Sequence, residues 1–534
     1  LEPCNLRPIV KEEYKEPCSR LYIRDKKTLL FEVTYYKKRI NFEVFHVLTD
    51  GTGATEFLKE LVKNYLYLVH KEEGLEQITL LPEDMTVQDQ EDDSFLKYYS
   101  KNQKRPKKRK LNAFQIRRKK KDGNHLHVHE SVVSVQAVLK RSRELGVSMT
   151  IFLTALFMMA INEEMSKMQK KKPVVLMVPV NLRKFFPSSS MLNFFNWIEP
   201  GYNFTTQDQS FEAVLKYTKE FFETELTKEK MSAHISELLA LELHPILRLA
   251  PLELKNLCIQ AGAKYSEKNT TAIFSNMSAV KMPASYVPYI ERFGVYTNTP
   301  KLELCLCSFQ DKLSFAFTSR YDTVNIERNF YRLLKEQGIT SEKVKPEFPK
   351  TGKPSEQEMK VYKIYSFLCI AAVAVMLVTD FNFHPRIRWT LFTAGGVVTM
   401  WIASSIGFFK RYNLLKNAMW QLIIGTIICF IWDALTGWHS WSVDLVLPIM
   451  SVSTLAAMFV TAKVQKSPVR EYLIYEIMAA GYGLILPVIL LLCGVVKNPT
   501  VSMFGALTCF LFLVAVILFK GREFKEEMQK NLHV

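Results

Sequence analysis

Residues 45–53 have the sequence Phe45-His46-Val47-Leu48-Thr49-Asp50-Gly51-Thr52-Gly53. Immediately before and into this stretch, apolar and polar side chains alternate over residues 39–47, which is the period of a half-buried strand. After it, apolar residues recur at helical spacing from Ala54 to Tyr65, which predicts an amphipathic helix. His46 continues the apolar face of the strand, so we expect its ring to point inward at the strand's end.

An imidazole at a strand end, followed by an acidic turn and a helix, can present a general base to a cavity. Two structural alternatives stay open at this point. His46 can be a satisfied core residue, and Asp50 or Thr52 can simply cap the helix.

The spacing His-x-x-x-Asp-Gly, formed here by His46, Asp50 and Gly51, resembles the motif of the CoA-dependent acyltransferase superfamily. That group includes chloramphenicol acetyltransferase and the condensation domains of peptide synthetases. The resemblance covers about residues 1–340 and is strongest to the bacterial alcohol O-acetyltransferase-like branch. The other matching pieces are Gly146–Leu153, Val178–Arg183, Phe274–Asn276 and the terminal strand, strand and helix between Leu302 and Glu336.

The resemblance implies two α/β lobes with mixed sheets, residues 1–134 and 135–340, and a tunnel between the lobes with the active histidine in its middle. In the family a strand and a helix precede this point, so we expect that the natural start before Leu1 is missing. The implied reaction moves an acyl group, such as acetyl, from a CoA thioester to a hydroxyl acceptor. Acyl-CoA is then a co-substrate, and neither a bound cofactor nor a metal is expected.

The family also implies roles for single residues. His46 is the expected general base, and Asp50 is expected to pair with an arginine, for which Arg183 is the candidate. Gly51 lets the turn close tightly. Ser275 or Asn276, at a strand end, could supply a hydrogen bond to the oxyanion or substrate, or could form a plain turn.

The sequence departs from the family in two places. Phe45 stands where condensation domains carry a second histidine, and their Asp-Phe-Gly-Trp-Gly motif is absent. Both departures favour simple O-acylation over peptide-bond synthesis. A competing hypothesis is a catalytically inactive, membrane-tethered binding or assembly protein that keeps an acyltransferase-like domain.

Further elements are predicted from pattern alone. Residues 29–36 and 39–47 should form an antiparallel pair turning at Lys37-Lys38, and residues 113–116 should form a hairpin with 125–133. A helix is expected over Ile235–Leu257. Three histidines (His125, His127 and His129) alternate along one strand face at a spacing that could bind metal, but no carboxylate or cysteine completes the set.

Residues 341–360 have a linker composition, and six apolar runs follow at about 361–379, 389–409, 417–435, 443–462, 472–493 and 500–519. We therefore expect an all-α, six-span membrane domain over 361–520 and a tail over 521–534. The excess of Lys and Arg in loops two and four and in the tail predicts a multi-pass cell-membrane protein with both ends cytoplasmic. Such tails resemble a bacterial membrane domain of unknown role. Asp433 and Asp444 lie near span ends and are either functional or solvated.

The net charge of +17 suggests an anionic partner or a location beside an anionic surface. Two basic clusters without an acidic residue lie within residues 101–121. Beside membrane spans, attraction to anionic lipid headgroups explains them more economically than nucleic-acid binding, and a solvated loop stays open. The nine cysteines include no CxxC pair, which favours reduced thiols in a cytosol-facing protein.

Overall fold

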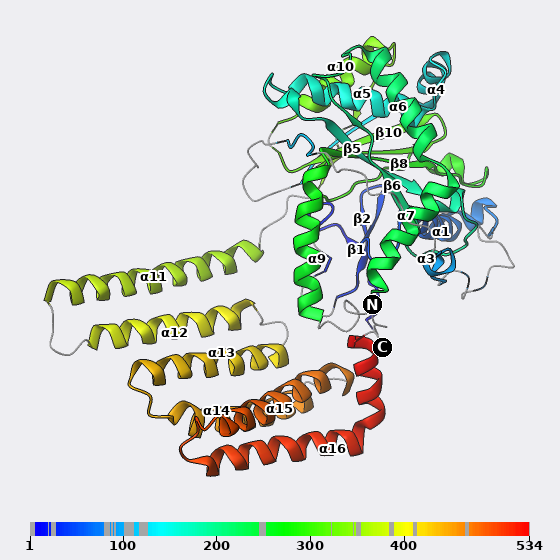
Figure 1. Cartoon of the computed structure of the whole chain (residues 1–534). Helices are drawn as coiled ribbons and strands as arrows, with labels where there is room; N and C mark the ends of the chain where they lie inside the picture. Colours follow the sequence, from blue (N-terminus) through cyan, green and yellow to red (C-terminus); the bar gives the residue numbers. More distant parts are fainter. Residues whose placement is uncertain are drawn as a thin grey trace. The chain divides into compact units, whose positions relative to one another are not determined.

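The computed structural model describes residues 6–19, 21–22, 28–78, 86, 89, 92–100, 112–116, 126–244, 252–321, 323–344, 346–348, 354–383, 389–409, 414–464 and 469–532. The chain divides into two compact units, with the main boundary between Thr351 and Gly352. The first unit has the two-lobed α/β architecture with mixed sheets that the sequence predicted. In the described part of the second unit, the regular structure is helical (Figure 1).

The smaller sheet of the first unit has three strands in the order β1-β2-β3. Strand β1 (Lys11–Glu12) runs parallel to β2 (Phe31–Tyr36), which pairs antiparallel with β3 (Arg39–Val44). The turn between β2 and β3 lies at Lys37 and Lys38, as predicted, and Lys37 has a φ of 52°. Helix α1 (Gly51–His70) follows.

The larger sheet has eight strands and is mixed. Seven of them have the order β11-β4-β10-β9-β8-β5-β6, and the eighth, β7, pairs with β5. The pairs β5–β8 and β8–β9 are parallel, whereas the other pairs are antiparallel. The strands are β4 (His127–Ser134), β5 (Val174–Asn181), β6 (Phe195–Ile198), β7 (Gly201–Tyr202), β8 (Ala272–Ala279), β9 (Leu302–Phe309), β10 (Lys312–Ser319) and β11 (Glu342–Val344).

The main core lies between this sheet and helix α5 (Met149–Glu164), which is apolar all round and therefore buried. Phe157 of α5 is 5.8 Å from Phe317 and 6.2 Å from Phe330 between ring centroids. Helices α5 and α4 are together apolar enough for a bent span, but α5 is enclosed in this core. The remaining helices of the unit are α3 (Ser94–Lys97), α4 (Val135–Glu144), α6 (Phe211–Glu225), α7 (Lys228–Glu242), α9 (Leu252–Ser266) and α10 (Asn325–Glu336).

Three expectations about the first unit are wrong. Residues 113–116 are not the hairpin partner of β4, because β10 and β11 occupy both edges of β4. Instead, Phe114 N donates to Pro173 O at 2.9 Å. The helix expected over Ile235–Leu257 is two helices, α7 and α9. Part of the expected linker 341–360 is strand β11, which pairs with β4.

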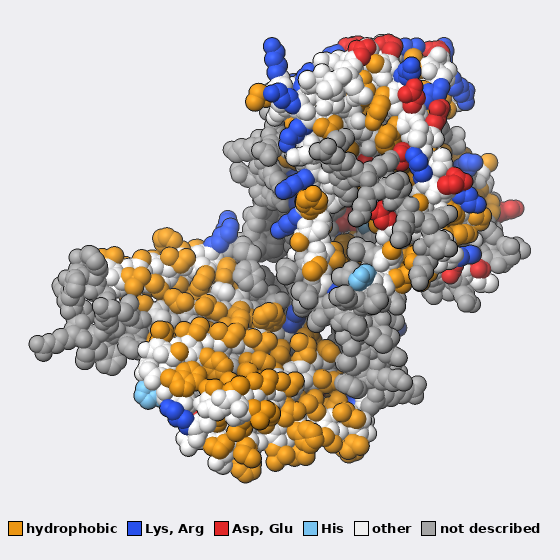
Figure 2. Space-filling view, in the orientation of Figure 1, with side chains coloured by type: hydrophobic (Ala, Val, Ile, Leu, Met, Phe, Trp, Pro, Cys, Tyr) orange, Lys and Arg blue, Asp and Glu red, His pale blue; other side chains and the backbone are white. Residues whose placement is uncertain are grey.

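The described part of the second unit contains six long helices, each of which contacts the next along the chain. Five candidate spans are long enough to cross a bilayer, which needs about 20 residues. The expectation of six spans is therefore not met in the described residues, since α12 is apolar only over the shorter stretch Thr393–Phe408. Hydrophobic side chains cover most of the described surface of these helices in view (Figure 2). The helices are α11 (Pro354–Phe383), α12 (Trp389–Phe409), α13 (Leu414–Leu435), α14 (Leu447–Val464), α15 (Val469–Leu492) and α16 (Pro499–Leu532).

Both acidic residues near the span ends are hydrogen-bonded inside the second unit. Asp433 accepts from the backbone N–H of His439 at 2.7 Å and from that of Ser442 at 3.1 Å. Asp444 accepts from the backbone N–H groups of residues 497–498 at 3.1 and 3.0 Å. Each carboxylate thus fixes a turn between helices and is buried, so neither is merely solvated.

Candidate active site

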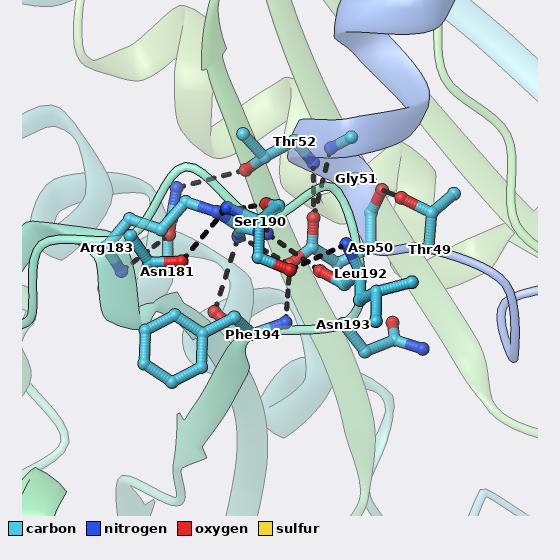
Figure 3. A network of polar contacts seen from close by, with 12 residues as sticks. Thr49, Asp50, Gly51, Thr52, Asn181, Arg183, Ser190, Leu192, Asn193 and Phe194 are labelled. Carbon is cyan, nitrogen blue, oxygen red and sulfur yellow. Dashed lines mark hydrogen bonds and ion pairs between the residues drawn. The ribbon is translucent and has the colours of Figure 1, made fainter. Parts of the chain in front are cut away.

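Asp50 joins two segments that are far apart in the sequence (Figure 3). Its Oδ1 accepts from the backbone N–H groups of Thr52 at 3.0 Å and Gly53 at 3.1 Å, so Asp50 caps α1. Its Oδ2 accepts from Arg183 Nη1 at 2.6 Å and from Phe194 N at 2.8 Å. Because both oxygens bond to the protein and the residue is buried, Asp50 holds the turn in place.

Arg183, the expected partner of the motif aspartate, also organises the loop that follows it (Figure 3). Its Nη2 donates to Ser190 O at 2.7 Å and to Leu192 O at 2.8 Å. Asn181, at the end of β5, accepts from Arg183 N at 2.9 Å and donates to Thr52 Oγ1 at 3.0 Å. The guanidinium, with its several donors in one plane, therefore ties the loop over residues 187–194 to the turn before α1.

The two glycines of the motif turn differ in what surrounds them. A Cβ on Gly53 would lie 2.4 Å from the backbone oxygen of Met191 and 2.2 Å from Thr49 Oγ1. A Cβ on Gly51 would meet only the flexible end of the Met277 side chain, at 2.0 Å. A glycine is therefore needed more strictly at position 53 than at position 51, because the two loops approach each other closely at Gly53. The sequence did not single out Gly53.

His46 lies in a turn and is exposed, so the expectation of an inward ring at a strand end is wrong. Strand β3 ends at Val44, and Leu48 N donates to Phe45 O at 2.9 Å, which is a turn hydrogen bond. Once the chain turns, the alternation of strand faces no longer sets the direction of the side chain. The imidazole instead lies 5.2 Å from the ring of Phe195.

Asn193 holds His46 from the neighbouring loop. Its Nδ2 donates to His46 O at 2.8 Å and to Val47 O at 3.3 Å, and its Oδ1 lies 3.2 Å from His46 Nδ1. Because Nδ2 is engaged with two carbonyl groups, Oδ1 is an acceptor for the ring, which places the proton on Nδ1 and leaves a lone pair on Nε2. No motif or spacing in the sequence pointed to Asn193, since the contact joins residues 147 positions apart.

Of the two candidate donors on β8, Asn276 is already engaged. Its Nδ2 donates to Thr150 Oγ1 at 3.0 Å, and its Oδ1 accepts from Ser278 N at 2.9 Å, at the register shift between Asn276 and Ala279. Strand β8 continues to Ala279, so the expected strand-end position of Asn276 is wrong. Ser275 lies on the opposite face of the sheet, in register with Cys305 of β9. The structure thus gathers His46, Asp50, Gly51 and Arg183 around one turn and separates Asn276 from Ser275 by sheet face.

Glu303 of β9 is a buried carboxyl group that the sequence did not single out, because one polar residue in an apolar strand is common. It is 4% exposed, and its Oε1 accepts from Cys305 Sγ at 3.5 Å. Burial raises the pKa of Glu303, while hydrogen bonds and the charge of His46 offset part of that rise. Glu303 is therefore within electrostatic range of the imidazole.

The histidines on β4 form a separate small cavity of about 140 Å³ with residues at the end of β10 and the start of α10. His129 Nδ1 lies 2.6 Å from Glu327 Oε2, and the rings of His127 and His129 are 6.4 Å apart. His125 lies outside the described residues. Within the described ranges, no group of three or more His, Cys, Asp or Glu side chains could hold a metal ion.

Two family models match the chain. Residues 9–241 match alcohol acetyltransferase, and residues 348–534 match a family of unknown function, DUF6320. A search of curated proteins finds no match.

Similar solved structures cover somewhat more than half of this chain at low identity. An epimerization domain from the third module of tyrocidine synthetase B has a TM-score of 0.34 and 13% identity, over 58% of this chain and 72% of that one. Polyketide synthase associated protein 5 from Mycobacterium tuberculosis has a TM-score of 0.39 and 12% identity, over 59% and 78%. Trichothecene 15-O-acetyltransferase from Fusarium sporotrichioides has a TM-score of 0.36 and 11% identity, over 58% and 70%. At these scores the likenesses bear on neither activity nor substrate.

The family matches agree with the division of the chain into units. The alcohol acetyltransferase match contains the motif turn, Arg183 and Asn193, and the second match contains all the candidate spans. The chain therefore has a region at residues 9–241 that matches the alcohol acetyltransferase family, followed by apolar helices in the region that matches DUF6320.

Proposed function

We propose that the protein is a membrane-bound O-acyltransferase that moves an acyl group from a CoA thioester to a hydroxyl acceptor, with His46 as general base. The observation that carries the proposal is the contact between Asn193 Oδ1 and His46 Nδ1 at 3.2 Å, which orients the ring and leaves Nε2 free to accept a proton. The alcohol acetyltransferase match over residues 9–241 supports the reaction class.

The reaction needs three events at one place. His46 Nε2 accepts the proton of the acceptor hydroxyl as its oxygen attacks the thioester carbonyl carbon. The carbonyl oxygen becomes an oxyanion, for which the Ser275 hydroxyl is our candidate donor, because the Asn276 amide is engaged with Thr150. When the C–S bond breaks, the CoA thiolate takes the proton back from His46, so the ester and the free thiol form with no net change in protonation.

Asp50 takes no proton in this scheme. Its carboxylate is occupied by Arg183 and by backbone donors, so its task is to hold the loop that carries His46 against the loop that carries Asn193. This division of labour matches the role that the superfamily motif implies.

In this proposal the second unit is the membrane anchor of the enzyme. Five candidate spans support a multi-pass protein, and the positions of Lys and Arg between them support a cytoplasmic location for the acyltransferase domain and the tail, residues 521–534. Acyl-CoA is available on that side. Residues 101–121, of which 101–111 and 117–121 lie outside the described residues, would then contact anionic headgroups.

One observation favours a second candidate, an inactive membrane-tethered binding or assembly protein. His46 is exposed, whereas a general base works best where water is excluded. Incubating the purified full-length protein with acetyl-CoA or longer acyl-CoA and a panel of alcohols separates the two. Alcohol-dependent release of free CoA supports the enzyme, and release no faster than without protein supports the binding protein.

A further inference from the structure

Two neighbouring polar groups on the larger sheet are buried without a hydrogen-bond partner among the described residues. They are Oε2 of Glu303 on β9 and Oγ1 of Thr318 on β10. These residues are 4% and 1% exposed. They stand directly opposite each other in the antiparallel pair, so their side chains lie on the same face of the sheet.

An unpartnered buried polar group is costly, and most such groups in proteins find a partner. Here two such atoms belong to residues directly opposite each other on adjacent strands, and Glu303 keeps its open Oε2 although Thr297, Cys305 and Thr299 act on the same carboxyl group. By contrast, Ser314 on the same face of β10 is satisfied, because its Oγ donates to Phe293 O at 2.9 Å. The pair of open groups is thus particular to the end of the sheet at Glu303 and Thr318.

Acidic groups surround this pair, and His46 is within electrostatic range of it. The Cys18 thiol has its pKa raised to about 12, first by burial and then by the negative charges of Glu43 and Glu303. Glu43 is itself a largely buried acid whose Oε2 has no hydrogen-bond partner, although Lys15 lies 3.8 Å from it. Burial raises the pKa of Glu303, and hydrogen bonds from Thr297, Cys305 and Thr299 lower it, as does the charge of His46 when that ring is protonated. A ligand that fits this environment brings a hydrogen-bond donor.

We propose that Glu303 and Thr318 form a subsite for a second hydrogen-bond donor on the acceptor, a hydroxyl or an ammonium group. This inference rests on the proposed function, in which His46 takes the proton of the reacting hydroxyl. The preferred acceptor is then a diol, a polyol or an amino alcohol. A plain alkyl alcohol leaves Oε2 of Glu303 unpaired, and sites built to bind a polar group discriminate strongly against analogues that lack it.

Three acceptors of equal size test the subsite: 1-butanol, 1,3-propanediol and 3-amino-1-propanol. With the full-length protein in detergent and acetyl-CoA as donor, kcat/KM for the better of the two bifunctional acceptors should exceed that for 1-butanol by about 10-fold or more. Glu303→Leu and Thr318→Val should each remove most of that preference. Ser314→Ala, which removes a satisfied hydroxyl from the same sheet face, should leave the preference intact.

Glu303→Gln distinguishes the two kinds of donor. It keeps an oxygen acceptor without the charge, so a preference for 1,3-propanediol should survive and a preference for 3-amino-1-propanol should fall. The inference is overturned if Glu303→Leu and Thr318→Val change kcat/KM equally for all three acceptors, or if wild-type protein prefers 1-butanol.

A binding measurement separates this inference from the proposed function. Saturation-transfer difference NMR on the full-length His46→Ala protein detects weak acceptor binding without turnover. A signal for 1,3-propanediol or 3-amino-1-propanol that Glu303→Leu abolishes supports the subsite even if no acyl transfer occurs. Equal signals for all three acceptors, unchanged by Glu303→Leu, overturn the subsite even if acyl transfer is fast.

Discussion

His46 Nδ1 and Asn193 Oδ1 lie 3.2 Å apart, and the amide of Asn193 also donates to the backbone oxygen of His46. One side chain therefore fixes both the position of the turn and the tautomer of the ring. The motif that contains His46 is recognisable in the sequence, whereas the role of Asn193 is visible only in the structure. The first prediction concerns Asn193.

Asn193→Ala should lower kcat on the order of 10²-fold, because a small misplacement of a reacting group has effects of this size. Asn193→Asp keeps an acceptor for Nδ1–H and should retain more activity than Asn193→Ala. Its negative charge should also raise the pKa of the base, so the acidic limb of the pH–rate profile should move to higher pH. Equal activity and identical pH profiles in both variants would mean that Asn193 has only a structural role.

Asp50→Asn should destabilise the first unit, because it leaves the largely enclosed guanidinium of Arg183 without its counter-charge. Breaking one partner of a buried ion pair costs roughly 3–5 kcal/mol. Asp93→Asn is a matched control, since Asp93 also caps a helix through two backbone N–H groups but is exposed, and asparagine caps a helix about as well as aspartate, so this variant should melt near wild type. The apparent melting temperature in detergent measures both. A variant at position 50 that melts normally yet has no activity would make Asp50 a direct participant in proton transfer.

Gly53→Ala should be more damaging than Gly51→Ala. The new methyl group at position 53 meets the backbone oxygen of Met191, which cannot rotate away, whereas at position 51 it meets the flexible end of Met277. Overpacking of this kind costs about 1–3 kcal/mol. Melting temperatures of the two variants check the order, and a larger loss in Gly51→Ala would show that the two loops are not held this closely.

Much of the first unit is predictable from sequence because its signals are local. Helix α5 and strand β5 are apolar runs, and the β2–β3 hairpin has two adjacent segments of strand residues, so length and period identify them. The pairing of Asp50 with Arg183 came from the family motif and is present.

What sequence patterns missed is long-range. The pairing of β4 with β10 and β11 depends on contacts between residues about 180 to 210 positions apart, and residues 113–116 offered a nearer but incorrect partner. The direction of His46 follows from a single turn bond that ends the strand. The roles assigned to Asn193 and Glu303 depend on neighbours that only folding brings beside them. No period or spacing carries that information.

The contact of His129 with Glu327 should make stability depend on pH. The hydrogen bond to Glu327 raises the pKa of His129 above its ordinary value of 6.5, and burial offsets part of the rise. A raised folded-state pKa means that this contribution is fully present below about pH 6.5 and is lost as the pH rises through the folded-state pKa. The melting temperature of Glu327→Gln should therefore fall below wild type at pH 5.5, and the gap should close at pH 9. The gap should be small because His129 is partly exposed. A difference in melting temperature that stays constant with pH would mean that it does not arise from the titration of His129.

The most direct test of the account is the rate of alcohol-dependent CoA release by the full-length protein and its His46→Ala variant, measured under saturating acyl-CoA. A positioned general base contributes typically about 10²–10⁴-fold, so the variant should lose activity by that factor while its melting temperature stays within a few degrees of wild type. Release of CoA by His46→Ala at near wild-type rates would contradict the assignment of His46 as the base.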